Sequence, residues 1–213
     1  MQRTCARSQR LEGCARQPYR RSARISAGAR AVEVRAVTEP HGLAVVTGSC
    51  SAVGIAELTL GGGYGPLIGR FGLALDNLIA ADIILADRRI VTAEPGNEED
   101  LFWAQRGGGG NFGVVAEMHI HLHELPNVVS GVLVYRFSEA RTVLRRFAEL
   151  ARSLPEALTV QVCAVAGPDG APVILPVPTW SGRQSCGEGL NGMGRAYAAT
   201  TVHCSTTREC IVS

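Results

Sequence analysis

The stretch Thr59–Asn77, TLGGGYGPLIGRFGLALDN, sets the first constraint on the fold. It places three consecutive glycines, beginning at Gly61, directly before Tyr64, and isolated glycines follow from Gly65 onward. Glycine tolerates positive φ, and it lets another backbone or a ligand approach without meeting a Cβ atom. The stretch therefore predicts a loop against which something packs very closely.

A second glycine loop, GGGGNFG, spans residues 107–113. Gly108, Gly110 and Gly113 match the dinucleotide pattern G-x-G-x-x-G, but that site needs a strand before the loop and a helix after it. Here a helical pattern precedes the loop and a strand pattern follows, so nicotinamide binding of the Rossmann type is disfavoured. The P-loop pattern is absent as well.

The two glycine loops together leave two interpretations open. Both could be tight turns required only by the protein's own packing. Alternatively, backbone N–H groups from both loops could approach one large, flat ligand that carries phosphate, and a flavin dinucleotide has the necessary length and oxygen atoms.

Hydrophobic periodicity and turn residues predict the elements before the second loop. We expect a strand at Ser22–Gly28, a helix at Arg30–Val37 and a buried strand at Leu43–Gly48. Residues 81–96, ADIILADRRIVTAEPG, predict a β-hairpin. Its turn lacks glycine, so either Arg88 adopts positive φ at a cost of roughly 1 kcal/mol or the loop is wider.

The helix predicted before the second loop has residues typical of both helix ends. Asn97 is the predicted N-cap, acidic residues 98–100 fill the first turn, Arg106 lies in the last turn and Gly107 follows as C′. After the loop we expect a strand at residues 114–125, an amphipathic helix within 138–154, and strands at 157–167 and 172–180. The helix is predicted from an apolar stripe made of Ala140, Val143, Leu144, Phe147, Leu150, Ala151 and Leu154.

Composition is that of a globular protein of one or two domains, with 213 residues, 46% hydrophobic residues and a net charge of +2. Residues 1–30 carry eight arginines against the single acid Glu12. This basic segment could be a targeting peptide or a nucleic-acid-binding arm, but a solvated surface is the simpler interpretation. No apolar run reaches the ~18 residues of a membrane span. With no export signal, we expect a cytoplasmic location.

Cysteine and histidine offer two further candidate sites. The seven cysteines lack Cys-x-x-Cys spacing, so neither a zinc site nor a disulfide framework is indicated. His119, His121 and His123 alternate along one strand, and imidazoles on one face could chelate a metal. No carboxylate or cysteine completes the set, so a wetted strand face is favoured and no metal is predicted.

Residues 46–78 and 100–115, read together, resemble the FAD-linked oxidases of the berberine-bridge-enzyme type, within the vanillyl-alcohol oxidase and p-cresol methylhydroxylase fold. The likeness extends from about Ser8 to Gly182. It implies an α+β fold with a partial FAD-binding domain at 1–126 and a partial antiparallel-sheet substrate domain at 127–182. Residues 183–213 match nothing in the family and are expected to be a disordered tail.

The resemblance also implies which residues bind FAD. In that family the segment at residues 47–54 and the glycine loop at 61–65 line the isoalloxazine and pyrophosphate. The segment at residues 111–115 reaches the other end of the flavin through backbone atoms. The implied residues are Thr47, Gly48, Cys50, Ser51, Val53 and Gly54; Gly61, Gly62, Gly63, Tyr64 and Gly65; and Asn111, Phe112, Gly113, Val114 and Val115.

Cys50 occupies the position that links sulfur to the flavin ring in bicovalent members of the family. A buried, unreactive cysteine is the alternative. Glu57 stands where the family usually has glycine or another small residue, and an unpaired carboxylate would be costly there if it were buried.

By resemblance, the whole enzyme would oxidise an alcohol, sugar or amine-type small molecule by hydride transfer to the flavin, with oxygen as acceptor. No nucleic acid or membrane partner is expected, and the oligomeric state stays open. The family's histidine for flavin attachment would precede Ser8, and its catalytic residues would follow Gly182. Neither Tyr64 nor Tyr135 lies at the catalytic tyrosine position, so the catalytic residues are unassigned. An inactive fragment that keeps part of a flavin site is the alternative.

Overall fold

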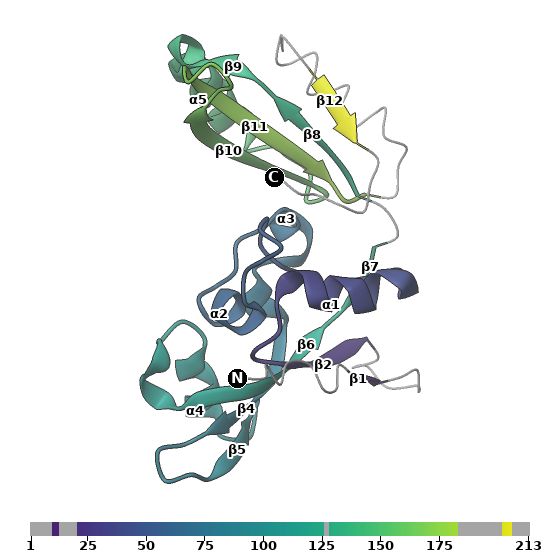
Figure 1. Ribbon diagram of the computed structural model, residues 1–213, viewed down its shortest axis with the longest axis vertical. Coiled ribbons are helices and arrows are strands. Elements are labelled where there is room, and N and C mark those ends of the chain that lie inside the picture. Colours follow the sequence, from purple (N-terminus) through teal and green to yellow (C-terminus); the bar gives the residue numbers. More distant parts are fainter. Residues whose placement is uncertain (1–9, 13–20, 126–127, 183–201, 206–213) are drawn as a thin grey trace. The chain divides into compact units, whose positions relative to one another are not determined.

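The computed structural model describes residues 10–12, 21–125, 128–182 and 202–205, with the backbone alone for residues 10–12 and 202–205. The chain divides into two compact units, Met1–Pro126 with Ile211–Ser213, and Asn127–Cys210. Each unit has its own antiparallel sheet and its own hydrophobic core (Figure 1).

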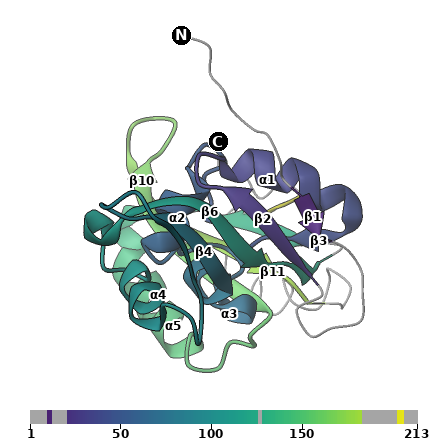
Figure 2. The same cartoon turned by 90° about the horizontal axis from the view of Figure 1, so that it is seen from below.

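The sheet of unit 1 has the strand order β1-β2-β6-β4-β5, and every neighbouring pair is antiparallel. Figure 2 shows β2, β6 and β4 side by side. The central strand β6 therefore pairs an early segment of the chain with a later hairpin. The strands are β1 (Arg10–Glu12), β2 (Ser22–Ser26), β4 (Leu78–Ile84), β5 (Ile90–Ala93) and β6 (Val114–His121), and β3 (Leu43–Ala44) pairs with β7 (His123–Glu124) outside this sheet.

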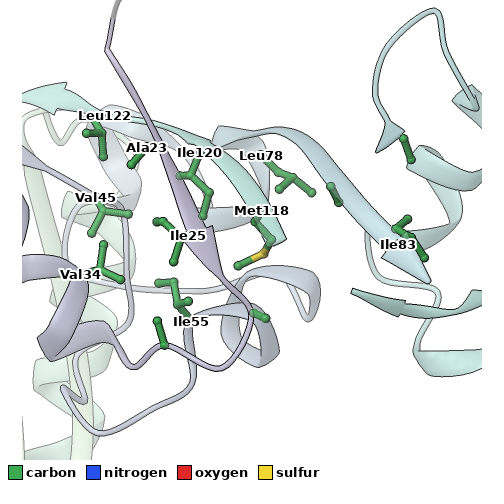
Figure 3. Close-up of a cluster of buried hydrophobic side chains, with 14 of the residues drawn as sticks. Ala23, Ile25, Val34, Val45, Ile55, Leu78, Ile83, Met118, Ile120 and Leu122 are labelled. Atoms are coloured by element: carbon green, nitrogen blue, oxygen red, sulfur yellow. The ribbon is translucent and has the colours of Figure 1, made fainter. Parts of the chain in front are cut away.

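Short helices cover one face of this sheet and close the core. Figure 3 shows Val34 and Ile55 directed toward Ile25 of β2 and Met118 of β6, and all four side chains are at most 2% exposed. Burial of one such side chain stabilises the fold by about 1.5–3 kcal/mol. The helices are α1 (Ala31–Thr38), α2 (Ile55–Leu60), α3 (Ile68–Phe71) and α4 (Glu99–Gln105), with 3₁₀ turns η1 (Glu39–His41), η2 (Ala74–Asn77) and η3 (Gly110–Phe112).

Unit 2 has the strand order β10-β11-β8-β12, and one long helix packs against its sheet. Val143 of the helix lies in a buried cluster with Leu133, Val160 and Ile174 from three strands. The elements are β8 (Val129–Leu133), β9 (Tyr135–Arg136), η4 (Phe137–Glu139), α5 (Ala140–Leu150), β10 (Leu158–Ala166), β11 (Pro172–Trp180) and β12 (Val202–Ser205), and β9 pairs with β11.

Most of the predicted elements are present. The hairpin β4–β5 is confirmed, and both features considered for its turn occur together. A three-residue loop separates Leu85 from Arg89, and Arg88 has φ of 71°. A left-handed residue at the end of the loop is common in hairpins with three-residue loops. The strand predicted at 43–48 is wrong beyond Ala44, because Val45 and Val46 are buried without strand pairing.

The N-cap prediction for α4 is wrong. Glu98, with φ of 49°, precedes the helix, and the side-chain amide of Asn97 donates instead to the carbonyl of Thr92 at 2.6 Å. At the other end, Gly107 has φ of 104°, as its predicted C′ position requires. Arg106 is the C-cap of the helix and lies just beyond its last turn.

Two further predictions need correction. The apolar stripe of α5 is right for Val143 but wrong for Leu144, which is 46% exposed, and for Ala151, which is exposed. Within the predicted disordered tail, Val202–Ser205 forms β12 and pairs antiparallel with β8. The other residues of that tail lie outside the described residues.

Candidate functional site

The structure brings the first two predicted cofactor segments into direct contact. Thr47 is buried, and a Cβ atom on Gly65 would overlap its carbonyl oxygen and lie 3.2 Å from the Cα of Gly48. A Cβ on Gly48 would in turn lie 3.5 Å from the carbonyl oxygen of Tyr64. Segments 47–54 and 61–65 therefore pack backbone on backbone, with α2 as the connector between them.

Gly63, like Gly65, is required by the protein's own packing. Gly63 has φ of 77°, a Cβ there would overlap the methyl group of Ala74, and the Ala74 N–H donates to the Gly63 carbonyl at 3.0 Å. At Gly62, with φ of 112°, no atom lies within 4 Å of the Cβ position. Gly61 is exposed, and its N–H donates to the Glu57 carbonyl at 3.3 Å. The loop is thus closed on the side of Gly63 and Gly65 and open on the side of Gly62.

The second glycine loop is joined to the first through η2. The N–H of Leu75 donates to the Gly62 carbonyl at 3.0 Å. The next residue, Asp76, lies 3.6 Å from the guanidinium of Arg106, measured from Oδ1 to Nη2, and Arg106 opens the second loop. A hydrogen bond and an ion pair therefore connect residues 61–65 with the end of α4.

The third predicted segment, 111–115, lies where η3 leads into β6. Asn111 and Phe112 are exposed, and a Cβ on Gly113, whose φ is 145°, would lie 2.6 Å from Cγ2 of Ile83. Val114 is 68% exposed, whereas Val115 packs against the core. The main chain of this segment is accordingly fixed by β4, while the side chains of Asn111, Phe112 and Val114 remain accessible.

Residues 27–31 form a second bridge between the segments, and they were missed among the predicted site residues. The Ala27 N–H donates to the Ala116 carbonyl at 2.9 Å. Two more bonds follow, from the Ile55 N–H to the Ala29 carbonyl at 2.8 Å and from the Ala31 N–H to the Val53 carbonyl at 3.0 Å. The run of small residues in SAGA, between a strand and a helix, is the sequence signal that could have indicated this close packing.

The loop from Cys50 to Gly54 contains N–H groups that find no backbone acceptor in the described part of the chain. Among the described residues, no backbone–backbone hydrogen bond has the N–H of Cys50, Ser51 or Ala52 as its donor, although the Ser51 carbonyl accepts from Val32 at 3.0 Å. The side chain of Cys50 is exposed and forms no disulfide. Because N–H groups without a protein acceptor can bind anions, this loop can accept a ligand oxygen.

The three histidines of the HIHLH run have other partners. Oγ of Ser22 lies 3.2 Å from Nε2 of His119. The ring of His123 stacks on Phe71 at 4.0 Å, and the ring of His121 approaches it edge-on at 4.7 Å. Within the described part of the chain, no group of three or more His, Cys, Asp or Glu residues is arranged to hold a metal.

His123 is held as a neutral imidazole. The side-chain amide nitrogen of Asn77 donates to the carbonyls of Phe71 and Leu73, at 3.0 and 2.8 Å. Its oxygen therefore faces Nε2 of His123, at 2.6 Å, and accepts the proton that Nε2 carries. Burial, together with the nearby His121 and Arg70, lowers the pKa of His123 to about 4.

Glu57 is not the buried, unpaired carboxylate that the sequence analysis considered. Its side chain is exposed at the start of α2, next to Gly54. The burial of an unpaired carboxylate therefore does not arise at this position.

No helix in the part of the chain that the structure describes is long and apolar enough to cross a membrane.

No family model matches the sequence. The FAD-linked oxidoreductase pgmH of Aspergillus terreus is 45% identical over 108 residues, which are 51% of this chain and 22% of pgmH. The FAD-linked oxidoreductase srdI of Neurospora crassa is 32% identical over 165 residues, 76% of this chain and 33% of srdI. The chain thus spans between a fifth and a third of the length of these relatives.

Solved structures give the same assignment for the fold. A chitooligosaccharide oxidase superposes with a TM-score of 0.75 at 27% identity, over 89% of this chain and 40% of that protein. The VAO-type flavoprotein MtVAO615 of Myceliophthora thermophila superposes with a TM-score of 0.76 at 26% identity, over 92% of this chain and 38% of that protein. The BBE-like 1 protein of Physcomitrella patens shares the fold, with a TM-score of 0.76 at 22% identity over 87% of this chain and 41% of that protein. The chain therefore belongs to the FAD-linked oxidoreductases of the vanillyl-alcohol-oxidase-type, berberine-bridge-enzyme-like fold, of which it spans a part.

Proposed function

We propose that unit 1 binds FAD through the main chain of residues 47–54, 61–65 and 111–115. The observation that carries this proposal is the pair of links that hold the three segments together, through residues 27–31 and through the Asp76–Arg106 ion pair. Segments so far apart in sequence need such links if they are to hold the two ends of one long cofactor.

The residues present fit FAD. A dinucleotide needs N–H donors for its pyrophosphate and a surface without Cβ atoms. The N–H groups of Cys50, Ser51 and Ala52 supply such donors, and the Cβ positions of Gly62, Gly109 and Gly110 have no atom within 4 Å. Tyr64, 56% exposed, adds an aromatic side chain at the edge of the first loop. These groups would bind and orient the cofactor.

The proposed activity is that of a flavin-dependent oxidase. Bound FAD would supply the redox chemistry, taking a hydride from the substrate and passing electrons to oxygen. Relatives include a glucooligosaccharide oxidase of Sarocladium strictum and an (R)-6-hydroxynicotine oxidase of Paenarthrobacter nicotinovorans, so the substrate class proposed is a sugar, alcohol or amine-type small molecule. No residue of this chain is assigned as the catalytic base.

A chain that binds FAD without oxidising a substrate is the second candidate. The two candidates differ in turnover and agree on cofactor binding. Cofactor binding is therefore the property to test first.

The test is an absorption spectrum of the purified full chain, recorded before and after acid precipitation. We expect flavin bands in the folded protein, either as purified or after FAD is added. Retention of colour in the acid pellet would identify a covalent link, and Cys50→Ala should abolish it. Cys163→Ala, which alters the other exposed free cysteine of the described chain, is the control. A colourless protein that takes up no added FAD would contradict the proposal.

A further inference from the structure

We propose that Glu57 places a negative charge at the FAD site that weakens FAD binding by this chain relative to a chain with a neutral residue at that position. The inference rests on the proposed function.

The position of the Glu57 side chain carries the inference. Its Oε2 lies 3.5 Å, and its Cβ 3.8 Å, from the point where a Cβ atom on Gly54 would be. Gly54 ends the loop that holds the unused N–H groups of Cys50, Ser51 and Ala52. The carbonyl oxygen of Glu57 also accepts the N–H of Gly61, so Glu57 lies between the two segments that pack together.

Glu57 takes part in none of the ion pairs found in the described part of the chain. Arg30, which lies opposite Gly54 in an isolated β-bridge, is paired with Glu33 at 3.4 Å. An exposed carboxylate is negatively charged at neutral pH. An anionic pyrophosphate held by the N–H groups of Ser51 and Ala52 would therefore meet a like charge from Glu57.

The size of the effect follows from Coulomb's law. Like charges separated by several ångströms at a wet surface repel weakly, and the repulsion is screened by salt within about 10 Å at 0.1 M ionic strength. We expect Glu57→Gln to lower the dissociation constant for FAD by about three- to tenfold at low salt. The difference should shrink toward unity at high salt.

The experiment is a titration of the full chain with FAD, followed by the change in FAD fluorescence at low and high sodium chloride. Glu57→Gln is compared with wild type and with Glu149→Gln. The control variant removes the same charge from an exposed position of α5 in unit 2. The inference predicts tighter binding for Glu57→Gln alone, and only at low salt.

The possible outcomes separate the two proposals. Equal dissociation constants for all three proteins would overturn the role of Glu57 and leave FAD binding intact. Weaker binding by Glu57→Gln would also overturn it, because the carboxylate would then be accepting a hydrogen bond from the cofactor. Absence of FAD binding by all three proteins would overturn both proposals.

Discussion

Gly65 shows at the residue scale why the first glycine loop admits no side chain. A Cβ atom there would overlap the Thr47 carbonyl and lie 2.9 Å from its carbon, so two backbone segments would have to separate. We expect Gly65→Ala to lower the free energy of unfolding by about 2 kcal/mol or more.

Gly28→Ala is the matched control for this substitution. Gly28 is exposed, its φ is not positive, and no atom lies within 4 Å of its Cβ position. It should change the free energy by no more than about 0.5 kcal/mol. Urea unfolding followed by circular dichroism measures both variants. Equal midpoints would contradict the packing described at Gly65.

His123 gives a pH prediction, also at the residue scale. Its pKa, about 4 in the folded protein, lies below the ordinary value of 6.5, so the unfolded chain takes up the proton first as the pH falls. Its contribution to stability is therefore full above pH 6.5 and is lost progressively toward pH 4. Because the ring is half-exposed and solvent screens it, we expect about 1 kcal/mol between pH 7.5 and 5.

The measurement is the pH dependence of urea unfolding for wild type and His123→Gln. The glutamine amide can still donate to Asn77 but does not titrate, so this variant should lose less stability in that pH range. His41→Gln, at an exposed histidine of η1, should keep the wild-type dependence. Parallel curves for all three proteins would argue against a neutral, desolvated His123.

At the scale of elements, α5 allows a test of which face is buried. Val143 is 4% exposed within the core of unit 2, and its neighbour Leu144 is 46% exposed. Val143→Ala should lower the free energy of unfolding by about 1–3 kcal/mol because it leaves a cavity, whereas Leu144→Ala should cost less than about 0.5 kcal/mol. The opposite ranking in urea unfolding would mean that the helix is rotated.

Elements with a strong period or a full set of end signals could be predicted from the sequence. The strands around Ile25, Met118 and Val160 alternate clearly, and α5 has a wide apolar stripe. The short helices α2 and α3 could not be predicted, because six and four residues hold too few turns to show a helical period. The N-cap prediction for α4 failed because the side-chain amide of Asn97 donates a hydrogen bond to the carbonyl of Thr92.

The candidate site could be predicted in part. The two glycine loops could be recognised from their runs of glycine. The family resemblance assigned both loops to one FAD site. Which glycines serve the fold and which leave open surface depends on contacts such as that of Gly63 with Ala74, which no local pattern encodes. The role of residues 27–31 depends likewise on hydrogen bonds to Ile55 and Ala116, far along the chain.

At the scale of the whole molecule, the two units have separate cores. Ile25 belongs to one buried cluster and Ile174 to the other. We expect Ile25→Ala to raise amide hydrogen exchange in β2 and β6 while β10 and β11 keep their protection, and Ile174→Ala to do the reverse. Hydrogen exchange with mass spectrometry distinguishes this from one cooperative core, in which either variant would deprotect both sheets.

The pairing of β2 with β6 also determines when unit 1 can fold during synthesis. Ser22 and His119, which meet across these strands, are 97 positions apart. While the chain leaves the ribosome, β2 must wait with Ile25 uncovered until β6 emerges, whereas the β4–β5 hairpin can close at once. Such high contact order slows folding and prolongs the exposure of apolar surface to chaperones and aggregation. Translation speed between these two strands should therefore influence how much of the protein is recovered in folded form.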